Sequence, residues 1–269
     1  MRNPSYLAEP SIGELPGALA SLASLKDNAV HLSLLIKQLK TSVGVVPFVG
    51  AGMSVPFGFP AWRSFLEKQA HGGEERQRIV GMLDRGQYEE AAEAIQETLG
   101  KEEFQRVLKE TFSERELPNP FPAAAILQLP RLCTGPVLTT NFDPVLEKVF
   151  ENAQRPFDDR ILGMKEVKKI GMAFNQNHHV LVKLHGDADD QSGRVLTKSD
   201  YKRAYGKREP LEAVLRFSFQ HPLLFLGCSL GNDRTVRVLD ALAKELRKHK
   251  AGALLGHFAV MERPETPPL

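Results

Sequence analysis

The sequence predicts an α/β fold, a Rossmann-like doubly wound parallel sheet with a helical insertion subdomain. Short continuous apolar runs recur along the chain of 269 residues, and their length suits strands that are buried on both faces. Polar or glycine-containing turns and helix-forming segments follow these runs, which is the alternation of a doubly wound sheet. Between Trp62 and Pro130 the apolar runs stop and a charged, helix-forming stretch replaces them, which predicts the insertion.

The expected elements follow in chain order. A helix is expected over residues 28–41, where apolar residues recur near helical spacing and lysines gather toward the C-terminal end, which the helix dipole favours. The run VGVVPFVGAG then reads as the first strand. Further strands are expected to end at Thr139, Leu184 and Leu226, and a last strand to lie within ALLGHFAVM.

The domain boundaries expected from these elements are simple. Residues 1–42 form a lead-in and helix, residues 43–260 form one domain with its helical insertion at about 62–130, and residues 261–269 form a linker. The final stretch ERPETPPL is rich in proline and resembles an interdomain linker. We therefore expect a further C-terminal region in the natural protein.

Composition excludes several classes of protein. The 35 basic and 33 acidic residues are mixed along the chain and give a formal net charge of +2, so neither a nucleic-acid nor a membrane surface is indicated. The two cysteines lie far apart without a C-x-x-C motif, which argues against a zinc ribbon, a redox dithiol or a disulfide scaffold. No apolar run approaches the roughly 18 residues of a membrane span, and no secretory signal precedes the domain. We expect a cytoplasmic protein without a metal.

Polar or glycine-rich sets follow four of the predicted strands. They are GAGMS from Gly50, TTNFD from Thr139, KLHGD from Lys183 and GCSLGND from Gly227. In an open parallel sheet, ligands bind outside the carboxyl ends of the strands. We therefore expect all four sets to surround one site.

The loop with Gly50 and Gly52 is typical of a phosphate site. Glycines let the backbone turn tightly and approach a pyrophosphate, whose charge the N–H groups and positive end of a following helix would hold. However, Val55 stands where the dinucleotide motif has its third glycine, and no strand with a ribose-binding acid follows roughly 20 residues later. This disfavours a hydride-transferring dehydrogenase.

A rival interpretation comes from the stretch GCSLG, which matches the G-x-S-x-G nucleophile elbow of esterases. It would make Ser229 the nucleophile, with Asp240 and His257 as its partners. The chain after Ser229 is too short for the remaining strands of that fold, and the other three strand-end sets would be unexplained. We therefore disfavour an esterase.

Taken together, the motifs resemble the sirtuin family, whose members consume NAD. GAGMS looks like the family's G-A-G-x-S loop, and GFPAWRSF is similar to its G-I-P-D-F-R-S segment, with Ala61 and Trp62 in place of aspartate and phenylalanine. TTNFD resembles T-Q-N-I-D, KLHGD resembles the catalytic H-G, and LGCSL resembles the G-T-S turn. The four-cysteine zinc module of the protein deacetylases is missing after His185. The chain thus resembles most the sirtuin-like NAD hydrolases of bacterial antiphage defence.

This resemblance implies that NAD is bound as the substrate and hydrolysed to ADP-ribose and nicotinamide, without a metal. It also implies a homo-oligomer or an assembly with a sensor domain or subunit, without a membrane and with nucleic acid only through a partner. The implied catalytic residues are Asn141, His185 and Asp143. The implied NAD-binding residues are Gly50, Ala51, Gly52, Ser54, Phe59, Trp62, Arg63, Thr140, Gly227, Ser229, Leu230, Asn232 and Asp233.

The chemistry of NAD cleavage fits these residue types, because the reaction builds positive oxocarbenium character on the ribose. The Asn141 amide can donate and accept hydrogen bonds without collapsing onto that cation, so we expect it to orient ribose and water. With an ordinary pKa near neutrality, His185 would suit general base work. Asp143 could polarise nicotinamide or cap the next helix, with Pro144 at its first position. Asn232 and Asp233 could likewise hold the adenosine ribose or cap a helix.

Two other functions remain open from the sequence. The domain could bind NAD or ADP-ribose as a sensor without catalysis. It could also act as an NAD-dependent protein deacylase, which the missing cysteines disfavour.

Overall fold

The structure is a computed structural model that describes residues 28–113, 117–163, 166–190, 192–205, 210–230, 234–248 and 256–261. The chain divides into two units, Met1–Gly44 and Val45–Leu269. In the first unit, helix α2 spans Asn28–Leu39. The Gln38 side chain donates a hydrogen bond to the Gly44 carbonyl at 2.8 Å, which closes the turn after α2.

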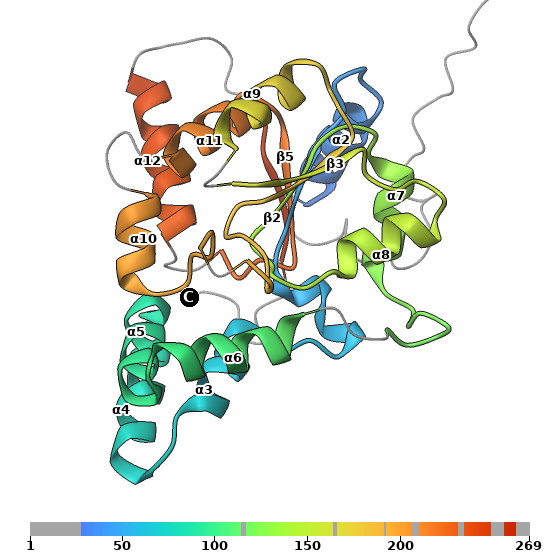
Figure 1. The fold of residues 1–269 in the computed structure, drawn as a ribbon. Helices are drawn as coiled ribbons and strands as arrows, with labels where there is room; N and C mark the ends of the chain where they lie inside the picture. The colour runs from blue at the N-terminus through green and yellow to red at the C-terminus, as the bar shows by residue number, and fades with distance from the viewer. Residues whose placement is uncertain are drawn as a thin grey trace, which may run out of the picture. The chain divides into compact units, whose positions relative to one another are not determined.

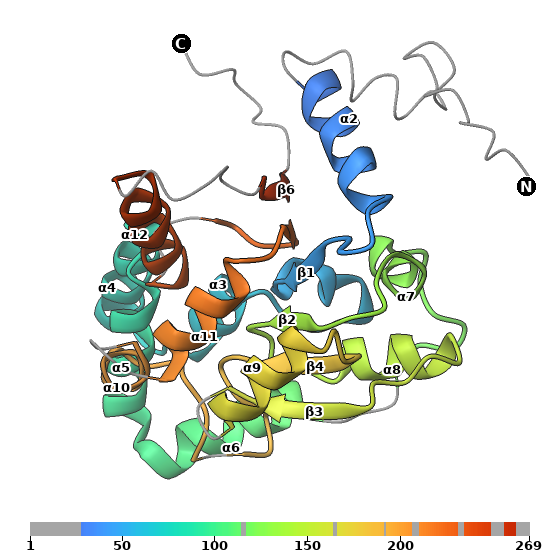
Figure 2. The same ribbon diagram turned by 90° about the horizontal axis from the view of Figure 1, so that it is seen from above.

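The second unit is built on a six-stranded sheet in the order β3-β4-β2-β1-β5-β6, and every neighbouring pair is parallel. Figure 2 shows β6, β1, β2, β4 and β3 in this succession. The order reverses at β1, with β2 to β4 on one side and β5 and β6 on the other. The α/β fold class is thereby confirmed. The strands are Val46–Val49 (β1), Val137–Thr139 (β2), Asp159–Leu162 (β3), Val180–Lys183 (β4), Leu223–Leu226 (β5) and Phe258–Val260 (β6).

The apolar runs form strands here because both faces of the sheet are covered. Neighbouring strand residues point to opposite faces, so Val137 and Leu181 pack into one core cluster while Leu138 and Val182 pack into another. Figure 1 shows the sheet between α8 on one side and α9, α11 and α12 on the other. Edge strand β3 was missed by the sequence analysis, because its residues Asp159 and Arg160 are exposed and charged.

Helices follow the strands and fill the insertion. The insertion contains α3 to α6, which lie together beyond one end of the sheet (Figure 1). The α-helices are Trp62–Gln69 (α3), Gly73–Asp84 (α4), Tyr88–Leu99 (α5), Lys101–Phe112 (α6), Leu129–Leu132 (α7), Val145–Asn152 (α8), Val167–Asn175 (α9), Lys198–Ala204 (α10), Pro210–Ser218 (α11) and Arg234–Lys248 (α12). The 3-10 helices are Ala51–Met53 (η2), Val55–Phe57 (η3) and Ala125–Gln128 (η4).

The insertion is fastened to the sheet domain through α5 and α10. Glu93 accepts hydrogen bonds from the Ser199 N–H at 2.9 Å and from its hydroxyl at 2.5 Å. Glu90 and Lys198 form an ion pair at 3.6 Å. These contacts hold the N-terminal part of α5 beside the start of α10.

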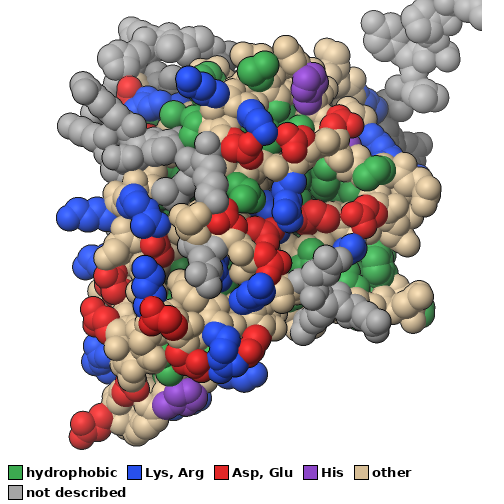
Figure 3. Space-filling model, viewed as in Figure 1, with side chains coloured by type: hydrophobic (Ala, Val, Ile, Leu, Met, Phe, Trp, Pro, Cys, Tyr) green, Lys and Arg blue, Asp and Glu red, His purple; other side chains and the backbone are tan. Residues whose placement is uncertain are grey.

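Charged side chains of both signs are interspersed over the insertion helices on the face shown in Figure 3. This agrees with the mixed charge along the sequence and differs from the clustered basic side chains of a nucleic-acid-binding face. Within the described part of the chain, no helix combines the length and apolar character needed to cross a bilayer.

Candidate functional site

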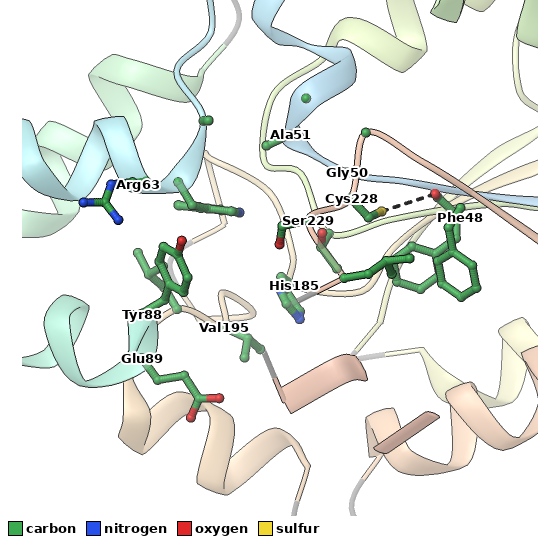
Figure 4. A pocket seen from close by; sticks show the side chains of 18 of the residues that line it. Phe48, Gly50, Ala51, Arg63, Tyr88, Glu89, His185, Val195, Cys228 and Ser229 are labelled. Carbon is green, nitrogen blue, oxygen red and sulfur yellow. Dashed lines mark hydrogen bonds between the residues drawn. The ribbon is translucent and has the colours of Figure 1, made fainter. Parts of the chain in front are cut away.

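A cavity of about 570 Å³ lies at the carboxyl ends of β1 and β5, where the strand order reverses. This is the place at which open α/β sheets bind ligands. Figure 4 shows His185 and Ser229 near its middle, with Arg63 and Tyr88 on one side and Phe48 on the other. The predicted site residues that line the cavity are Gly50, Ala51, Gly52, Trp62, Arg63, Thr140, His185, Gly227, Ser229 and Leu230.

The glycines of the first loop serve a close approach between two strand ends. The Gly50 N–H donates to the Leu226 carbonyl at 2.9 Å and the Gly52 N–H to the Gly227 carbonyl at 3.0 Å. A Cβ atom on Gly50 would lie 2.6 Å from the Gly227 carbonyl oxygen, and one on Gly52 would lie 3.0 Å from the same atom. Gly227 itself has φ +64°, a conformation that favours glycine. The loops after β1 and β5 therefore touch backbone to backbone.

The expected α-helix after this loop is absent, and that prediction was wrong. Two 3-10 turns, η2 and η3, follow β1 instead. The Met53 and Ser54 N–H groups donate to the carbonyls of Gly50 and Ala51. Among the described residues, no acceptor meets the Ala51 N–H, and Ala51 lines the cavity. The Ala51 N–H is thus available to an anion, and no α-helix begins directly at this loop.

Ser54, Asn141 and Asp143 form a hydrogen-bonded group outside the cavity lining. The Asn141 amide donates to the Ser54 hydroxyl at 3.1 Å, and that hydroxyl donates to the Asp143 carboxylate at 2.9 Å. All three side chains are buried, with Asn141 only 3% exposed. The Asn141 Oδ1 atom has no hydrogen-bond partner among the described residues. The group fixes the amide and leaves one acceptor unused, although a buried unpaired acceptor costs about 1–3 kcal/mol.

Asp143 also accepts a hydrogen bond from the Val145 N–H at 3.1 Å. It thus caps the start of α8, but the helix begins at Val145 and Pro144 holds the cap position, one residue later than predicted. Burial raises the pKa of the Asp143 carboxyl above its ordinary value, and the charge of Lys183 opposes this effect.

Lys183 ties the loop after β2 to the loop after β4. Its Nζ atom is fully buried and donates to the Phe142 and Asp143 carbonyls at 3.1 and 2.9 Å. It also lies 3.0 Å from Asp187 and 3.2 Å from Glu147. Burial works to lower its pKa, but these carboxylates together hold the pKa above the ordinary lysine value. A charged lysine therefore fixes the Asn141 loop relative to the His185 loop.

His185 lies in the cavity wall and contacts two tyrosines, Tyr201 of α10 and Tyr205, which directly follows α10. Its Nε2 atom is 2.8 Å from the Tyr205 hydroxyl, and the rings of Tyr201 and Tyr205 contact its ring edge to face. Burial lowers the pKa of His185 to about 3. The expectation of a pKa near neutrality was therefore wrong, because the imidazole is desolvated and lacks a nearby carboxylate that would stabilise its cation. The ring is neutral at physiological pH.

The segment from Phe59 to Arg63 is divided between core and cavity. Phe59 is 1% exposed in the core and does not line the cavity, whereas Trp62 lines it and packs edge to face against Phe142. The Arg63 guanidinium lines the rim and pairs with Asp84 at 2.6 Å and with Glu67 at 2.8 Å. Trp62 is thus the aromatic side chain that this segment presents to a ligand.

The turn after β5 contributes Ser229 and Leu230, and Leu230 adopts a positive φ of 48°. Cys228 also lines the cavity, and its Sγ atom is 3.5 Å from the Phe48 carbonyl. The predicted residues Asn232 and Asp233 lie outside the described residues.

The geometry excludes the esterase triad. The Nδ1 atom of His257 accepts a hydrogen bond from the Leu223 N–H, at the start of β5, while Ser229 follows the end of that strand. The two side chains therefore lie at opposite ends of the parallel strands. Asp240 pairs with Lys244 on the exposed face of α12.

Sequence reasoning missed the residues that the insertion and α10 bring to the cavity. Tyr88 and Glu89 begin α5, and Tyr201 lies on α10; all three line the cavity. They follow no strand, so the search at strand ends could not find them. In the sequence, the small residues Ala91 and Ala92 closely follow Glu89, and in the structure all three are buried. These small neighbours are the sequence signal that could have indicated the burial of Glu89. Among the described residues, no cluster of His, Cys, Asp and Glu has the geometry of a metal site.

Comparison with known proteins supports this fold. Residues 136–268 match the family model of the SIR2-like domain. The chain is 26% identical over 209 residues to a protein of Bacillus cereus named NAD(+) hydrolase ThsA, which covers 75% of this chain and 41% of the relative. It is 23% identical over 242 residues to a protein of the same name from Acinetobacter baumannii, covering 88% of this chain and 46% of the relative.

A third relative is the Defense-associated sirtuin 2 of Bacillus subtilis, 23% identical over 231 residues, which cover 83% of this chain and 22% of the relative. The chain thus spans less than half the length of these relatives. Residues 136–268, just under half of the chain, match the SIR2-like domain, which supports the sirtuin resemblance predicted from the strand-end motifs.

Proposed function

We propose that this chain hydrolyses NAD to ADP-ribose and nicotinamide and acts as an effector of antiphage defence by depleting NAD in the bacterial cytoplasm. The observation that carries the proposal is the cavity at the β1 and β5 ends, whose wall combines the glycine loop, Thr140, His185 and Ser229. The names of the relatives support the same reaction. We also propose that an oligomer or a sensor region controls the activity.

The size and lining of the cavity suit a dinucleotide. Its volume of about 570 Å³ lies within the usual range of small-molecule sites, roughly 300–1,000 Å³. One side is apolar, with Phe48, Phe225 and Leu239, and would accept the adenine ring. The other side carries Trp62 and His185 and would accept nicotinamide and its ribose. The Ala51 N–H and the Ser229 hydroxyl would bind the diphosphate between them.

Cleavage of the glycosidic bond requires a positioned water and a stabilised ribosyl cation. With Nε2–H of His185 donating to the Tyr205 oxygen, the neutral ring would present its lone pair at Nδ1, where it would accept a proton from water or a ribose hydroxyl. The unused Oδ1 atom of Asn141 would accept a ribose hydroxyl. Ser54 would hold the amide in that orientation, since it occupies the donor side.

A second function is favoured by the burial of Asn141 and Asp143 outside the cavity lining. In that case the domain would bind NAD or ADP-ribose as a sensor, without turnover. Incubation of the purified chain with NAD distinguishes the two. Release of nicotinamide and ADP-ribose supports hydrolysis; saturable binding of NAD without release, also in the oligomeric and full-length protein, supports the sensor and contradicts the proposed hydrolysis.

A further inference from the structure

Glu89 places a carboxylate in the wall of the cavity from an unexpected direction. It is the second residue of α5, within the insertion, and it is only 5% exposed. Figure 4 shows the Tyr88 and Glu89 side chains leaving α5 in different directions, with Val195 between Glu89 and His185 in this view. Among the described residues that line the cavity, Glu89 is the one carboxylic acid.

The position of Glu89 is fixed by its neighbours on α5. Glu90 pairs with Lys198 and Glu93 accepts two hydrogen bonds from Ser199, so one side of the helix is anchored on α10. Ala91 and Ala92 pack fully buried behind it. The first turn of a helix also favours a negative charge. The carboxylate is therefore held in place before any ligand arrives.

Arg237 of α12 is one partner of Glu89. Its Nη2 atom is 3.4 Å from Oε1, and the Arg237 side chain is 62% exposed. An ion pair with so exposed a partner is weak. A carboxylate has about four acceptor positions on its two oxygens, so it can serve a protein partner and a ligand together.

We propose that the Glu89 carboxylate accepts hydrogen bonds from the vicinal diol of a nucleotide ribose. This inference rests on the proposed function, because NAD brings two such diols into the cavity. Dinucleotide-binding folds use an acidic residue on a ribose hydroxyl in the same way, but deliver it from a strand end. Here α5 delivers an acid to the cavity, while Asp233, which the sequence places after β5, lies outside the described residues.

The test is calorimetric binding of ADP-ribose, the proposed product, to wild type and to three variants. Glu89→Gln keeps the shape but loses the charge, and charge-assisted hydrogen bonds are roughly twice as strong as neutral ones. We expect its Kd to rise about tenfold. The matched control Glu97→Gln changes an exposed acid of the same helix, which lies outside the cavity lining, and should leave the Kd within about twofold. Arg237→Gln removes the ion pair but keeps the carboxylate, and should do the same.

Unchanged ADP-ribose binding in Glu89→Gln would overturn the inference, and so would equal weakening in Glu89→Gln and Arg237→Gln, since only the ion pair would then matter. Failure of wild type to bind either NAD or ADP-ribose would instead contradict the proposed function. Two further ligands identify the ribose. ADP carries only the adenosine diol and nicotinamide mononucleotide only the other diol, so the variant loses affinity for the one whose diol Glu89 contacts.

Discussion

Replacement of Gly50 by alanine tests the role assigned to the glycine loop. The added Cβ would lie 2.6 Å from the Gly227 carbonyl oxygen and 2.9 Å from the Cys228 Sγ atom, closer than real Cβ contacts allow. Because the nearest atom belongs to the backbone, the β1 and β5 loops must separate. The separation strains the two hydrogen bonds that join them, from Gly50 to Leu226 and from Gly52 to Gly227.

The cost can be estimated from these contacts. Overpacking costs about 1–3 kcal/mol, and each weakened hydrogen bond adds about 0.5–1.5 kcal/mol. We therefore expect Gly50→Ala to lower the free energy of unfolding by roughly 2–6 kcal/mol, a large part of the usual 5–15 kcal/mol. The corresponding fall in Tm is roughly 4–24 °C for a domain of this size, at about 2–4 °C per kcal/mol.

Thermal unfolding of Gly50→Ala and of a control variant measures this cost. Gly73→Ala is the control, because Gly73 begins α4 and a Cβ there would meet nothing within 4 Å. Its Tm should stay equal to wild type or rise slightly, since alanine favours helices. Gly50→Ala with a wild-type Tm but without NAD binding would refute the reasoning, because the glycine would then serve only the approach of a phosphate.

Three further predictions follow from the buried polar groups. Lys183→Met leaves Asp187 without its buried cation and should cost about 3–5 kcal/mol in urea unfolding; a loss no larger than that of the exposed-pair control Lys198→Met would contradict this. Tyr205→Phe removes the 2.8 Å contact with His185 and should cost about 1 kcal/mol and lower kcat with little change in KM; an unchanged kcat would show that the hydroxyl does not orient the ring. Folding depresses the pKa of His185 to about 3, so below pH 6.5 the folded state binds fewer protons than the unfolded state. The free energy of unfolding therefore decreases on acidification, by about 3 kcal/mol at pH 4.5. His185→Gln, measured in parallel, should lose correspondingly less on acidification, and an identical pH profile would refute the shift.

Much of the fold could be predicted because strands buried on both faces leave an unbroken apolar run. Leu138 and its neighbours in β2 are all apolar because helices cover both faces of the sheet, and this run predicts a buried strand. Strand β3 escaped prediction because an edge strand can remain charged; Asp159 and Arg160 carry no apolar signal. The insertion was predicted from the loss of apolar runs after Trp62, since helices with one packed face keep charged residues on the other.

The site could be predicted only where residues follow strands. His185 and Ser229 come together in the cavity because parallel strands end at one edge. The contact of Tyr205 with His185 and the place of Glu89 in the cavity wall depend on how α10 and α5 pack against that edge, which local patterns do not encode. The depressed pKa of His185 could not be predicted either, because it results from burial by those same tertiary contacts.

The glycine loop has a structural role that the sequence did not indicate. Gly50 and Gly52 were interpreted as a phosphate loop before a helix, which stays a prediction; the structure adds that their N–H groups bond to β5 and its turn. The partner loop at Gly227 was visible in the sequence. What the sequence could not show is that the two glycine turns lie against each other.

His185 is the residue that we propose to act at the cavity in the cleavage of NAD. Nicotinamide release from NAD, measured for wild type, His185→Ala and His178→Ala, tests this proposal most directly. His178 is exposed and precedes β4, whereas His185 follows that strand and lines the cavity. We expect release by wild type and His178→Ala and a loss of at least about 100-fold in His185→Ala, the lower range for a general base. Equal release by all three proteins would contradict it.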